Sequence, residues 1–290
     1  MRRSMRRFVT IAAIQSRVSN DTAATLKKTG EMVRQAAQKG AQIICLQELY
    51  RTIYFPQYKR MDVGNWAETV PGESTRTFAK LAQELGVVII IPLFEKAKNG
   101  KYYNAAVVID QSGKLLPTYR KTHLPQDPLF YEQNYFEHGR SGYQVYKTQF
   151  AAFAVLICYD QWFPEAARAA TLAGADIIFY PTAIGNVVGY KSPDGDWHAA
   201  WETVMRGHAI ANGVHVVAVN RVGREDRLRF WGQSFACNSF GKIIKRASAS
   251  KEEVLAAKLD LSHNQRIREG WGFLRNRRPD TYRFRIAGPR

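Results

Sequence analysis

Short apolar runs alternate with amphipathic stretches along the first half of the chain. Residues 8–15 (FVTIAAIQ) are rich in β-branched side chains and predict a strand. Asn20 or Asp21 can cap a following helix, whose apolar residues recur at helical spacing until Gly40 ends it. Residues 41–48 (AQIICLQE) are almost continuously apolar, as is typical of a strand covered on both faces.

The alternation continues and then changes to a hairpin. The spacing predicts a helix over residues 78–85 that stops at Gly86, followed by a buried strand over residues 87–95 (VVIIIPLFE). Residues 102–110 and 115–121 flank the turn sequence QSGK, which predicts an antiparallel pair.

The second half of the chain repeats this order. Residues 164–181 resemble residues 34–48 in their succession of helix, Gly-Ala and apolar strand, and residues 208–220 resemble residues 81–92. We therefore expect an α/β protein with two related sheets packed face to face and helices outside. No linker rich in Pro, Gly or Ser separates the halves, which predicts a single domain over residues 1–290. Residues 263–290, rich in Arg and Trp, are expected to extend onto a neighbouring subunit of a homo-oligomer.

Composition narrows the class of protein. A chain of 290 residues, 46% of them hydrophobic, can bury a large core. The three cysteines, Cys45, Cys158 and Cys237, are far apart and lie among apolar residues, which excludes a disulfide framework or a CxxC metal site and indicates a reducing compartment. No apolar stretch approaches the roughly 20 residues of a membrane span, and the N-terminus lacks signal-peptide features. We expect a soluble, cytoplasmic protein.

The formal net charge of +17 raises the question of a nucleic-acid partner. The basic residues are scattered, apart from MRRSMRR at the start and RNRRPDTYRFR near the end, and no nucleic-acid-binding module is evident. We expect a solvated or subunit-facing basic surface rather than a nucleic-acid site.

Cys158 follows an apolar run in VLICYDQWFP, and a lone cysteine in such a place is usually a core residue. It becomes a nucleophile only where a base or cation lies nearby. His208 and His215 could supply a base, but one lies in an amphipathic stretch and the other in a buried strand, so structural roles are expected. Glu48 and Lys121 close apolar strands, at a sheet edge where sites of layered α/β proteins collect.

These residues carry a family resemblance. Glu48 in LQELY, Lys121 in YRKTHLP and Cys158 in ICYDQWFPE resemble the Glu, Lys, Cys signature of the nitrilase superfamily, the carbon–nitrogen hydrolases. The resemblance covers nearly the whole chain, to WGFLRNRRPDTYR, and implies a four-layer αββα sandwich. Within the superfamily the chain is most similar to N-carbamoylputrescine amidohydrolases, which carry CWDQWFPE where this chain has CYDQWFPE, followed by FYPTAIG.

The resemblance implies a hydrolase that cleaves the terminal C–N bond of an N-carbamoyl amine such as N-carbamoylputrescine. Glu48 would accept the proton of Cys158, whose sulfur attacks the carbon and forms a thioester-like intermediate. Lys121 and the backbone N–H of Tyr159 would stabilise the developing oxyanion. Ammonia leaves, water releases a carbamic acid, and loss of carbon dioxide frees the amine. No metal or organic cofactor is required.

The resemblance also implies supporting residues. Glu132 in LFYEQNYF corresponds to a second family glutamate, expected to hold Lys121 and orient the substrate amide. Tyr54 and Trp162 are expected to form an apolar wall for the substrate.

Three residues that follow Cys158 are expected to be structural. Glu165 and Arg168 are spaced to pair on one helix face and brace the turn. Asp160, two residues after Cys158, is also expected to support the fold.

One departure from the family pattern concerns the substrate. An aliphatic ammonium would need a carboxylate near the pocket mouth, and the acid typical of carbamoylputrescine hydrolases after FYPTAIG is replaced here by an apolar pair, with Asp194 and Asp196 only later. The alternatives are another amidase, an N-carbamoyl-β-alanine hydrolase or a nitrilase. A non-catalytic nucleic-acid-binding protein is the alternative of a different class, and the intact set of Glu48, Lys121 and Cys158 argues against it.

Overall fold

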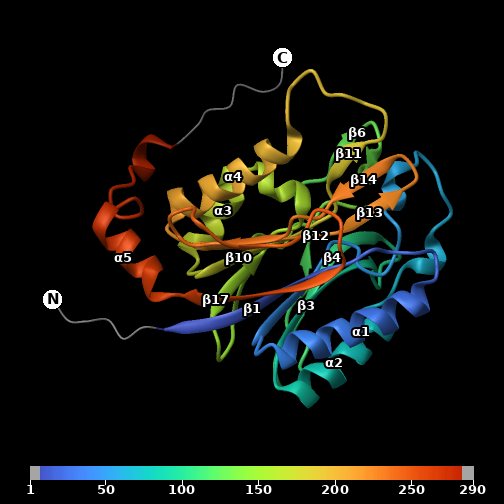
Figure 1. Cartoon of the computed structure of the whole chain (residues 1–290), viewed down its shortest axis with the longest axis horizontal. Coiled ribbons are helices and arrows are strands. Elements are labelled where there is room, and N and C mark those ends of the chain that lie inside the picture. Colours follow the sequence, from blue (N-terminus) through green and yellow to red (C-terminus); the bar gives the residue numbers. More distant parts are fainter. Residues whose placement is uncertain (1–6, 283–290) are drawn as a thin grey trace.

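Two six-stranded sheets pack face to face at the centre of the molecule, and a pair of helices covers the outer side of each (Figure 1). The computed structural model describes residues 7–282. Its four layers form the αββα sandwich that the sequence predicts.

The two sheets are built alike. In the first, the order is β17-β1-β2-β3-β4-β5, and β1, β2 and β3 run parallel while their outer neighbours run antiparallel. In the second, the order is β16-β15-β12-β10-β9-β8, with β9, β10 and β12 parallel. The internal repeat seen in the sequence is therefore a repeat of sheet topology. The strands of the first sheet are β1 (Phe8–Gln15), β2 (Ile43–Leu46), β3 (Val88–Lys96), β4 (Tyr102–Ile109), β5 (Tyr119–Arg120) and β17 (Glu253–Asp260), and those of the second are β8 (Val145–Lys147), β9 (Ala152–Val155), β10 (Ile177–Thr182), β12 (His215–Asn220), β15 (Phe235–Cys237) and β16 (Ile243–Arg246).

The helices connect the parallel strands in the same way in each half. Helices α1 (Thr22–Gln38) and α2 (Glu73–Leu85) join the parallel strands of the first sheet, and α3 (Pro164–Leu172) and α4 (Trp197–Asn212) join those of the second. Asp21 caps α1, since its Oδ1 accepts a hydrogen bond from the N–H of Ala24 at 2.8 Å.

Alternating side chains of each strand place the core on both faces of the first sheet. In β1, Val9, Ile11 and Ala13 join the cluster between the sheets, whereas Ala12 and Ile14 join the cluster under α1 and α2. A strand buried on both faces must be apolar throughout, which explains the continuous hydrophobic runs in the sequence.

Smaller elements gather at one corner of the sandwich, where β6, β11, β13 and β14 lie together in Figure 1. A two-stranded hairpin and a separate three-stranded sheet form there. The remaining elements are β6 (Gln126–Asp127), β7 (Phe130–Tyr131), β11 (Gly185–Val187), β13 (Val222–Glu225), β14 (Leu228–Trp231), α5 (Ser262–Trp271) and the 3-10 turns η1 (Phe55–Gln57), η2 (Gly64–Trp66), η3 (Glu132–Asn134), η4 (Cys158–Trp162) and η5 (Pro279–Thr281).

The structure corrects two strand lengths. The predicted strand over residues 41–48 ends at Leu46, which leaves Glu48 in the turn beyond it. The predicted strand over residues 115–121 is reduced to a bridge at Leu115 and the short β5. Pro117 lies between these two pieces and has no N–H to donate to a ladder.

The first part of the C-terminal tail, helix α5, packs against its own chain. Asn264 donates a hydrogen bond to the carbonyl of Asp176, and Arg268 donates one to that of Ala175, both at 2.8 Å, so α5 packs beside the second sheet. Residues 283–290 of the expected extension, and residues 1–6 of the basic N-terminus, lie outside the described residues. No helix within residues 7–282 is long and apolar enough to cross a membrane.

Candidate active site

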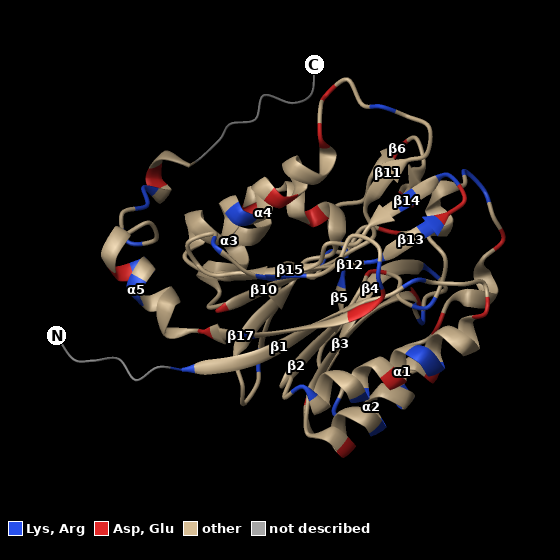
Figure 2. Cartoon of the chain, viewed as in Figure 1, with Lys and Arg blue, Asp and Glu red and all other residues tan. Residues whose placement is uncertain are grey.

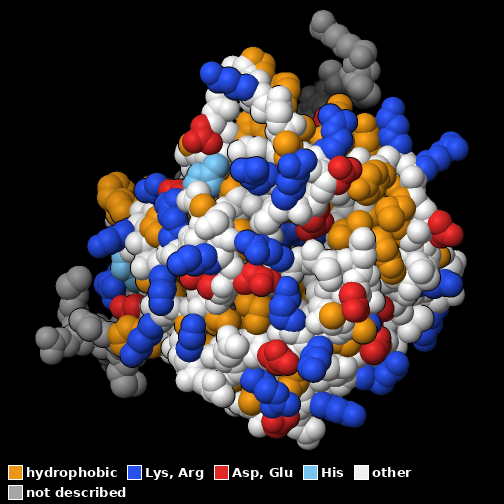
Figure 3. All heavy atoms as spheres, turned by 45° about the vertical axis from the view of Figure 1, so that its right-hand side comes forward, with side chains coloured by type: hydrophobic (Ala, Val, Ile, Leu, Met, Phe, Trp, Pro, Cys, Tyr) orange, Lys and Arg blue, Asp and Glu red, His pale blue; other side chains and the backbone are white. Residues whose placement is uncertain are grey.

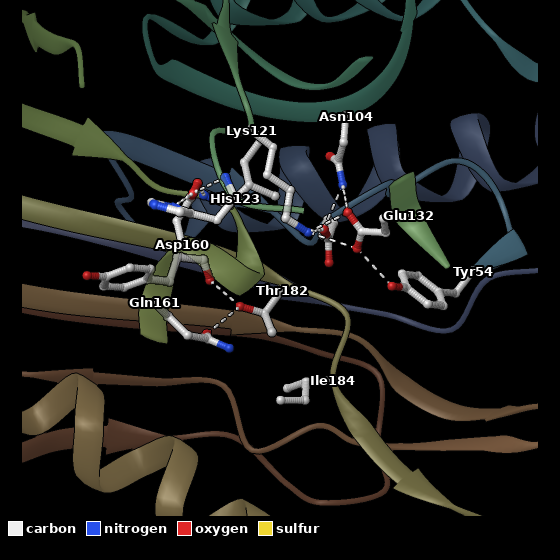
Figure 4. Close-up of polar contacts among 12 residues, drawn as sticks. Tyr54, Asn104, Lys121, His123, Glu132, Asp160, Gln161, Thr182 and Ile184 are labelled. Atoms are coloured by element: carbon white, nitrogen blue, oxygen red, sulfur yellow. Dashed lines mark hydrogen bonds and ion pairs between the residues drawn. The ribbon is translucent and has the colours of Figure 1, made fainter. Parts of the chain in front are cut away.

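Three buried charged side chains meet where strands of the first sheet end. Glu48 follows β2, Lys121 follows β5 and Glu132 opens η3, and the side chains of all three are fully buried. The Lys121 ammonium lies 2.8 Å from Glu48 Oε1 and 2.7 Å from Glu132 Oε2 (Figure 4). The structure therefore brings together three residues that are dispersed over 84 positions between Glu48 and Glu132 in the sequence.

Two neutral side chains complete this cluster. The amide of Asn104 donates to Glu48 Oε1 at 2.8 Å, and the Tyr54 hydroxyl donates to Glu132 Oε1, also at 2.8 Å. Glu48 Oε2 is buried and has no hydrogen-bond partner among the residues described. A buried carboxylate oxygen without a donor is costly, so this atom gains free energy when another group brings it a proton. Because no described residue occupies its lone pairs, Oε2 is free to accept that proton.

Cys158 is the first residue of η4, just beyond the end of β9. Its φ of 42° is in the left-handed region, which is uncommon for a non-glycine residue and is found disproportionately at functional sites. Cys158 lines a cavity of about 800 Å³ together with Glu132, Tyr54, Tyr159 and Trp162. Every residue predicted for the site thus lies in the buried cluster or in this adjoining cavity.

The charges of the cluster determine the protonation of the thiol. Burial, followed by the negative charge of Glu48, raises the pKa of Cys158 well above its ordinary value, although Lys121 acts in the opposite direction. Cys158 is therefore a neutral thiol at rest and needs a base before it can attack.

The pKa values of Lys121 and Glu132 are both raised, but for different reasons. Burial alone would lower the pKa of Lys121, but the charges of Glu132 and Glu48 outweigh burial and raise it, so the ammonium stays charged. Burial raises the pKa of Glu132 to about 7 against the opposing effect of Lys121. The cluster thus combines a fixed cation with a carboxyl group that titrates near neutrality.

Asp160 joins the Cys158 turn to the segment that carries Lys121. Its buried carboxylate accepts hydrogen bonds from the N–H of Ile157 at 2.9 Å and from the hydroxyl of Tyr119 at 2.7 Å. It also contacts both the N–H of His123, at 3.0 Å, and the His123 ring, at 2.7 Å. These partners flank Cys158 on one side and Lys121 on the other, so the structural role expected for Asp160 acts directly at the site.

A second buried brace was not predicted. Arg221, directly after β12, forms a 2.7 Å ion pair with Glu225 and donates to the carbonyls of Glu48, at 2.7 Å, and Leu49, at 3.0 Å. Glu225 in turn accepts from the N–H of Tyr54 at 2.6 Å. Two sequence signals could have indicated these buried polar residues. Arg221 is a charge directly after the apolar strand HVVAVN, and Asn104 is a polar residue inside the apolar strand YYNAAVVI.

The histidines considered as bases have structural partners. His208 Nε2 lies 2.8 Å from the carbonyl of Gln161, and His215 Nδ1 lies 2.7 Å from Asn264. The expected pairing of Glu165 with Arg168 is wrong. Arg168 instead donates to the carbonyl of Ala211 at 2.9 Å, because its long side chain reaches across to α4.

The cavity wall beyond Cys158 is largely apolar. Val187 and Val188 line it at the position where a carboxylate would be expected. Asp196 caps α4 through the N–H of His198 at 2.9 Å, and Asp194 contacts Ser192, so both later acids serve their own loop.

Positive charge is dispersed over the molecule. Helices α1 and α5 each carry basic residues together with one acidic residue (Figure 2). On the face shown in Figure 3, Lys and Arg side chains are separated by acidic and apolar ones. This face presents no continuous basic stripe of the kind that follows a nucleic-acid backbone.

Residues 10–269 match the family model for carbon–nitrogen hydrolases. The chain is 42% identical to the N-carbamoylputrescine amidase of Solanum lycopersicum, over 97% of this chain and 96% of the relative. It is 36% identical to the citrullinase of Francisella tularensis, over 94% of this chain and 96% of the relative. The carbon–nitrogen hydrolase of Helicobacter pylori G27 has a similar structure, with a TM-score of 0.90 at 37% identity over 95% of this chain and 97% of the other.

Proposed function

The chain belongs to the carbon–nitrogen hydrolase family, and from this premise we propose that it hydrolyses the terminal C–N bond of N-carbamoyl amines, with N-carbamoylputrescine as the main substrate. Its hydrolysis would yield putrescine, carbon dioxide and ammonia. One relative is named citrullinase. Citrulline and N-carbamoylputrescine both end in a ureido group, which supports this group as the reacting part of the substrate. The single observation that carries the proposal is the unpartnered Oε2 of buried Glu48 beside a cavity that holds a neutral thiol.

In the proposed first step, Glu48 takes the proton of Cys158 while the sulfur attacks the ureido carbon. A raised thiol pKa makes this proton transfer necessary, because little thiolate exists before the substrate arrives. Lys121 and Asn104 hold Glu48 through Oε1, which leaves Oε2 to accept the proton.

Negative charge then develops on the ureido oxygen. Lys121 is the proposed donor to this oxygen, together with the N–H of Tyr159, which lies in the first turn of η4, where N–H groups have no partner within the helix. One such donor typically contributes about 3–4 kcal/mol to the transition state. Glu132 is proposed to fix the ammonium and to accept a hydrogen bond from the substrate NH2 group.

The intermediate is resolved by transfer of the Glu48 proton to the leaving nitrogen. Ammonia departs, a thioester-like carbamoyl group remains on Cys158, and water activated by Glu48 releases a carbamic acid. The carbamic acid loses carbon dioxide to give the amine. Each proposed step uses only groups of this protein. Tyr54 and Trp162 form the proposed wall beside the alkyl part of the substrate.

The proposal extends to assembly and compartment. We infer one domain over the whole chain, a cytoplasmic location and a homo-oligomer in which the tail from residue 263 contacts a neighbouring subunit. Trp271 at the end of α5 is 57% exposed, and its ring centre lies 5.4 Å from that of exposed Phe240, so a pair of aromatic side chains is available for such a contact. Sedimentation of wild type beside Trp271→Glu tests this, and equal masses would contradict it.

The function is tested by ammonia release from a panel of N-carbamoyl amines, N-carbamoyl amino acids, amides and nitriles, with Cys158→Ala as the blank. Turnover of the ureas above that of amides and nitriles supports the proposal. Ammonia release that persists in Cys158→Ala, or the absence of any release from ureas at micromolar enzyme, would contradict it.

A further inference from the structure

Two charged side chains at the rim of the active-site cavity have no partner in the described part of the chain. Asp127, Glu132 and Arg227 are the charged residues that line the cavity. Glu132 is engaged by Lys121 and Tyr54. Asp127 and Arg227 are both exposed, and neither side chain forms a hydrogen bond or ion pair with another residue in the range 7–282.

These two residues come from different elements that both contribute to the lining of the cavity. Asp127 lies in β6, paired with Phe130 of the hairpin that leads to Glu132. Arg227 lies in the turn between β13 and β14, and its carbonyl accepts a hydrogen bond from the N–H of Val188 at 2.8 Å. β6, β11, β13 and β14 occupy the same corner of the molecule in Figure 1.

The space between the rim and Cys158 suits an aliphatic chain. Trp162, Ile184, Val187 and Trp197 contribute apolar surface to the cavity wall. Tyr159 also lines the cavity, next to Cys158 in the chain. The cavity lining therefore combines buried Glu132 and Cys158, a largely apolar wall, and two exposed charges.

The two rim charges have opposite consequences for a singly charged substrate. Two unit charges about 4 Å apart in water interact by about 1 kcal/mol, so the attraction of a distal ammonium to Asp127 and its repulsion by Arg227 are of the same size. Lys59, Arg60 and one acidic residue, Asp226, line a groove that Arg227 also lines, so the charge of this groove is net positive. A substrate that bears an ammonium and a carboxylate at its far end uses both rim residues.

We propose that the cavity also accepts ω-ureido α-amino acids, with the α-ammonium at Asp127 and the α-carboxylate at Arg227. This inference rests on the proposed function, because it assigns the far end of a substrate whose ureido end reacts at Cys158. The reaction is the same at the reacting carbon. The S–C bond forms as the terminal C–N bond breaks, and one water is consumed overall to give ammonia, carbon dioxide and a diamino acid.

Four ureas of matched length test the proposal. n-Butylurea is neutral, N-carbamoylputrescine carries a distal ammonium, 5-ureidopentanoate carries a distal carboxylate, and citrulline carries both. Ammonia release would give kcat and KM for each with wild type, Asp127→Asn, Arg227→Gln and a matched control, Arg229→Gln, which removes an exposed charge of β14 outside the cavity lining.

We expect citrulline to exceed n-butylurea in kcat/KM with the wild type. Exposed charge pairs contribute up to about 1 kcal/mol, so Asp127→Asn should lower kcat/KM by about three- to fivefold for citrulline and carbamoylputrescine, through KM, and leave n-butylurea unchanged. Arg227→Gln should lower kcat/KM for citrulline and ureidopentanoate by about the same factor and raise it for carbamoylputrescine. Arg229→Gln should match wild type throughout.

Two failures are distinguishable. If the ureas are cleaved but citrulline is no better than n-butylurea, or all four respond alike to both rim substitutions, the rim assignment is wrong while the proposed function stands. If none of the four releases ammonia, the proposed function fails and the rim assignment fails with it.

Discussion

Arg221 donates a hydrogen bond from Nη2 to the carbonyl oxygen of Glu48 at 2.7 Å. A residue that follows a strand of the second sheet thereby fixes the backbone of the proposed base, which follows a strand of the first. The position of Glu48 thus depends on the face-to-face packing of the two sheets, because that packing brings Arg221 to its carbonyl. The same guanidinium pairs with Glu225, which holds the N–H of Tyr54.

Replacing Arg221 should destabilise the protein strongly. Arg221→Met leaves the Glu225 carboxylate without its cation and the Glu48 carbonyl without its donor, whereas the Leu49 carbonyl keeps the N–H of Thr52. Breaking a buried ion pair from one side costs about 3–5 kcal/mol, so the urea midpoint followed by circular dichroism should fall clearly. Arg224→Met, which removes an exposed arginine of β13, is the matched control. Equal midpoints for the two variants would rule out this role of Arg221.

Loss of the free carboxylate oxygen at Glu48 should abolish base catalysis and leave the fold intact. Glu48→Gln keeps the shape of the side chain and an acceptor for Lys121 and Asn104, but its amide accepts no proton from Cys158. General-base catalysis contributes about 10²–10⁴-fold, and kcat for urea hydrolysis should fall by that range. Alkylation of Cys158 by iodoacetamide should slow in parallel. A variant with wild-type kcat would exclude Glu48 as the base.

Asp160 should affect the rate more than substrate affinity. Asp160→Asn removes an acceptor shared by Ile157, Tyr119 and His123, which releases the Cys158 turn from the segment that carries Lys121. Because a misplacement of about 1 Å can cost about 10²-fold in rate, kcat should fall by that order while KM changes little. Asp194→Asn, an exposed acid outside the cavity lining, serves as the control. A change confined to KM would contradict a positioning role.

The raised pKa of Glu132 predicts how stability depends on pH. Its folded pKa of about 7 lies above the ordinary value of 4.5, so the folded protein holds a proton that the unfolded chain has released between these values. Stability contributed by this group is therefore present below pH 4.5 and is lost as the pH rises to 7. The urea midpoint of wild type relative to Glu132→Gln should therefore fall as the pH rises across this window. A constant difference between the two proteins would contradict the shift.

Local pattern predicted the layers, and the resemblance of three motifs to the nitrilase superfamily predicted the charged residues of the cluster. Continuous apolar runs indicated buried parallel strands, and the motifs around Glu48, Lys121 and Cys158 identified three segments that the structure brings to one region. The buried partners were harder to predict, since Arg221 acts through carbonyls of residues 173 and 172 positions away. The Glu165 and Arg168 prediction failed because helical spacing permits a pair but does not exclude a competing acceptor on another helix.

The repeated topology has a consequence for the number of reaction centres. Cys158 lies five residues beyond Phe153, the partner of Ile177, and Ser16 lies five residues beyond Ile11, the partner of Ile43. By the same register Thr182 corresponds to Glu48. The positions quasi-equivalent to Cys158 and Glu48 are therefore held by two hydroxyl-bearing residues, one from each half, and the molecule is chemically one-sided although its sheets repeat one topology.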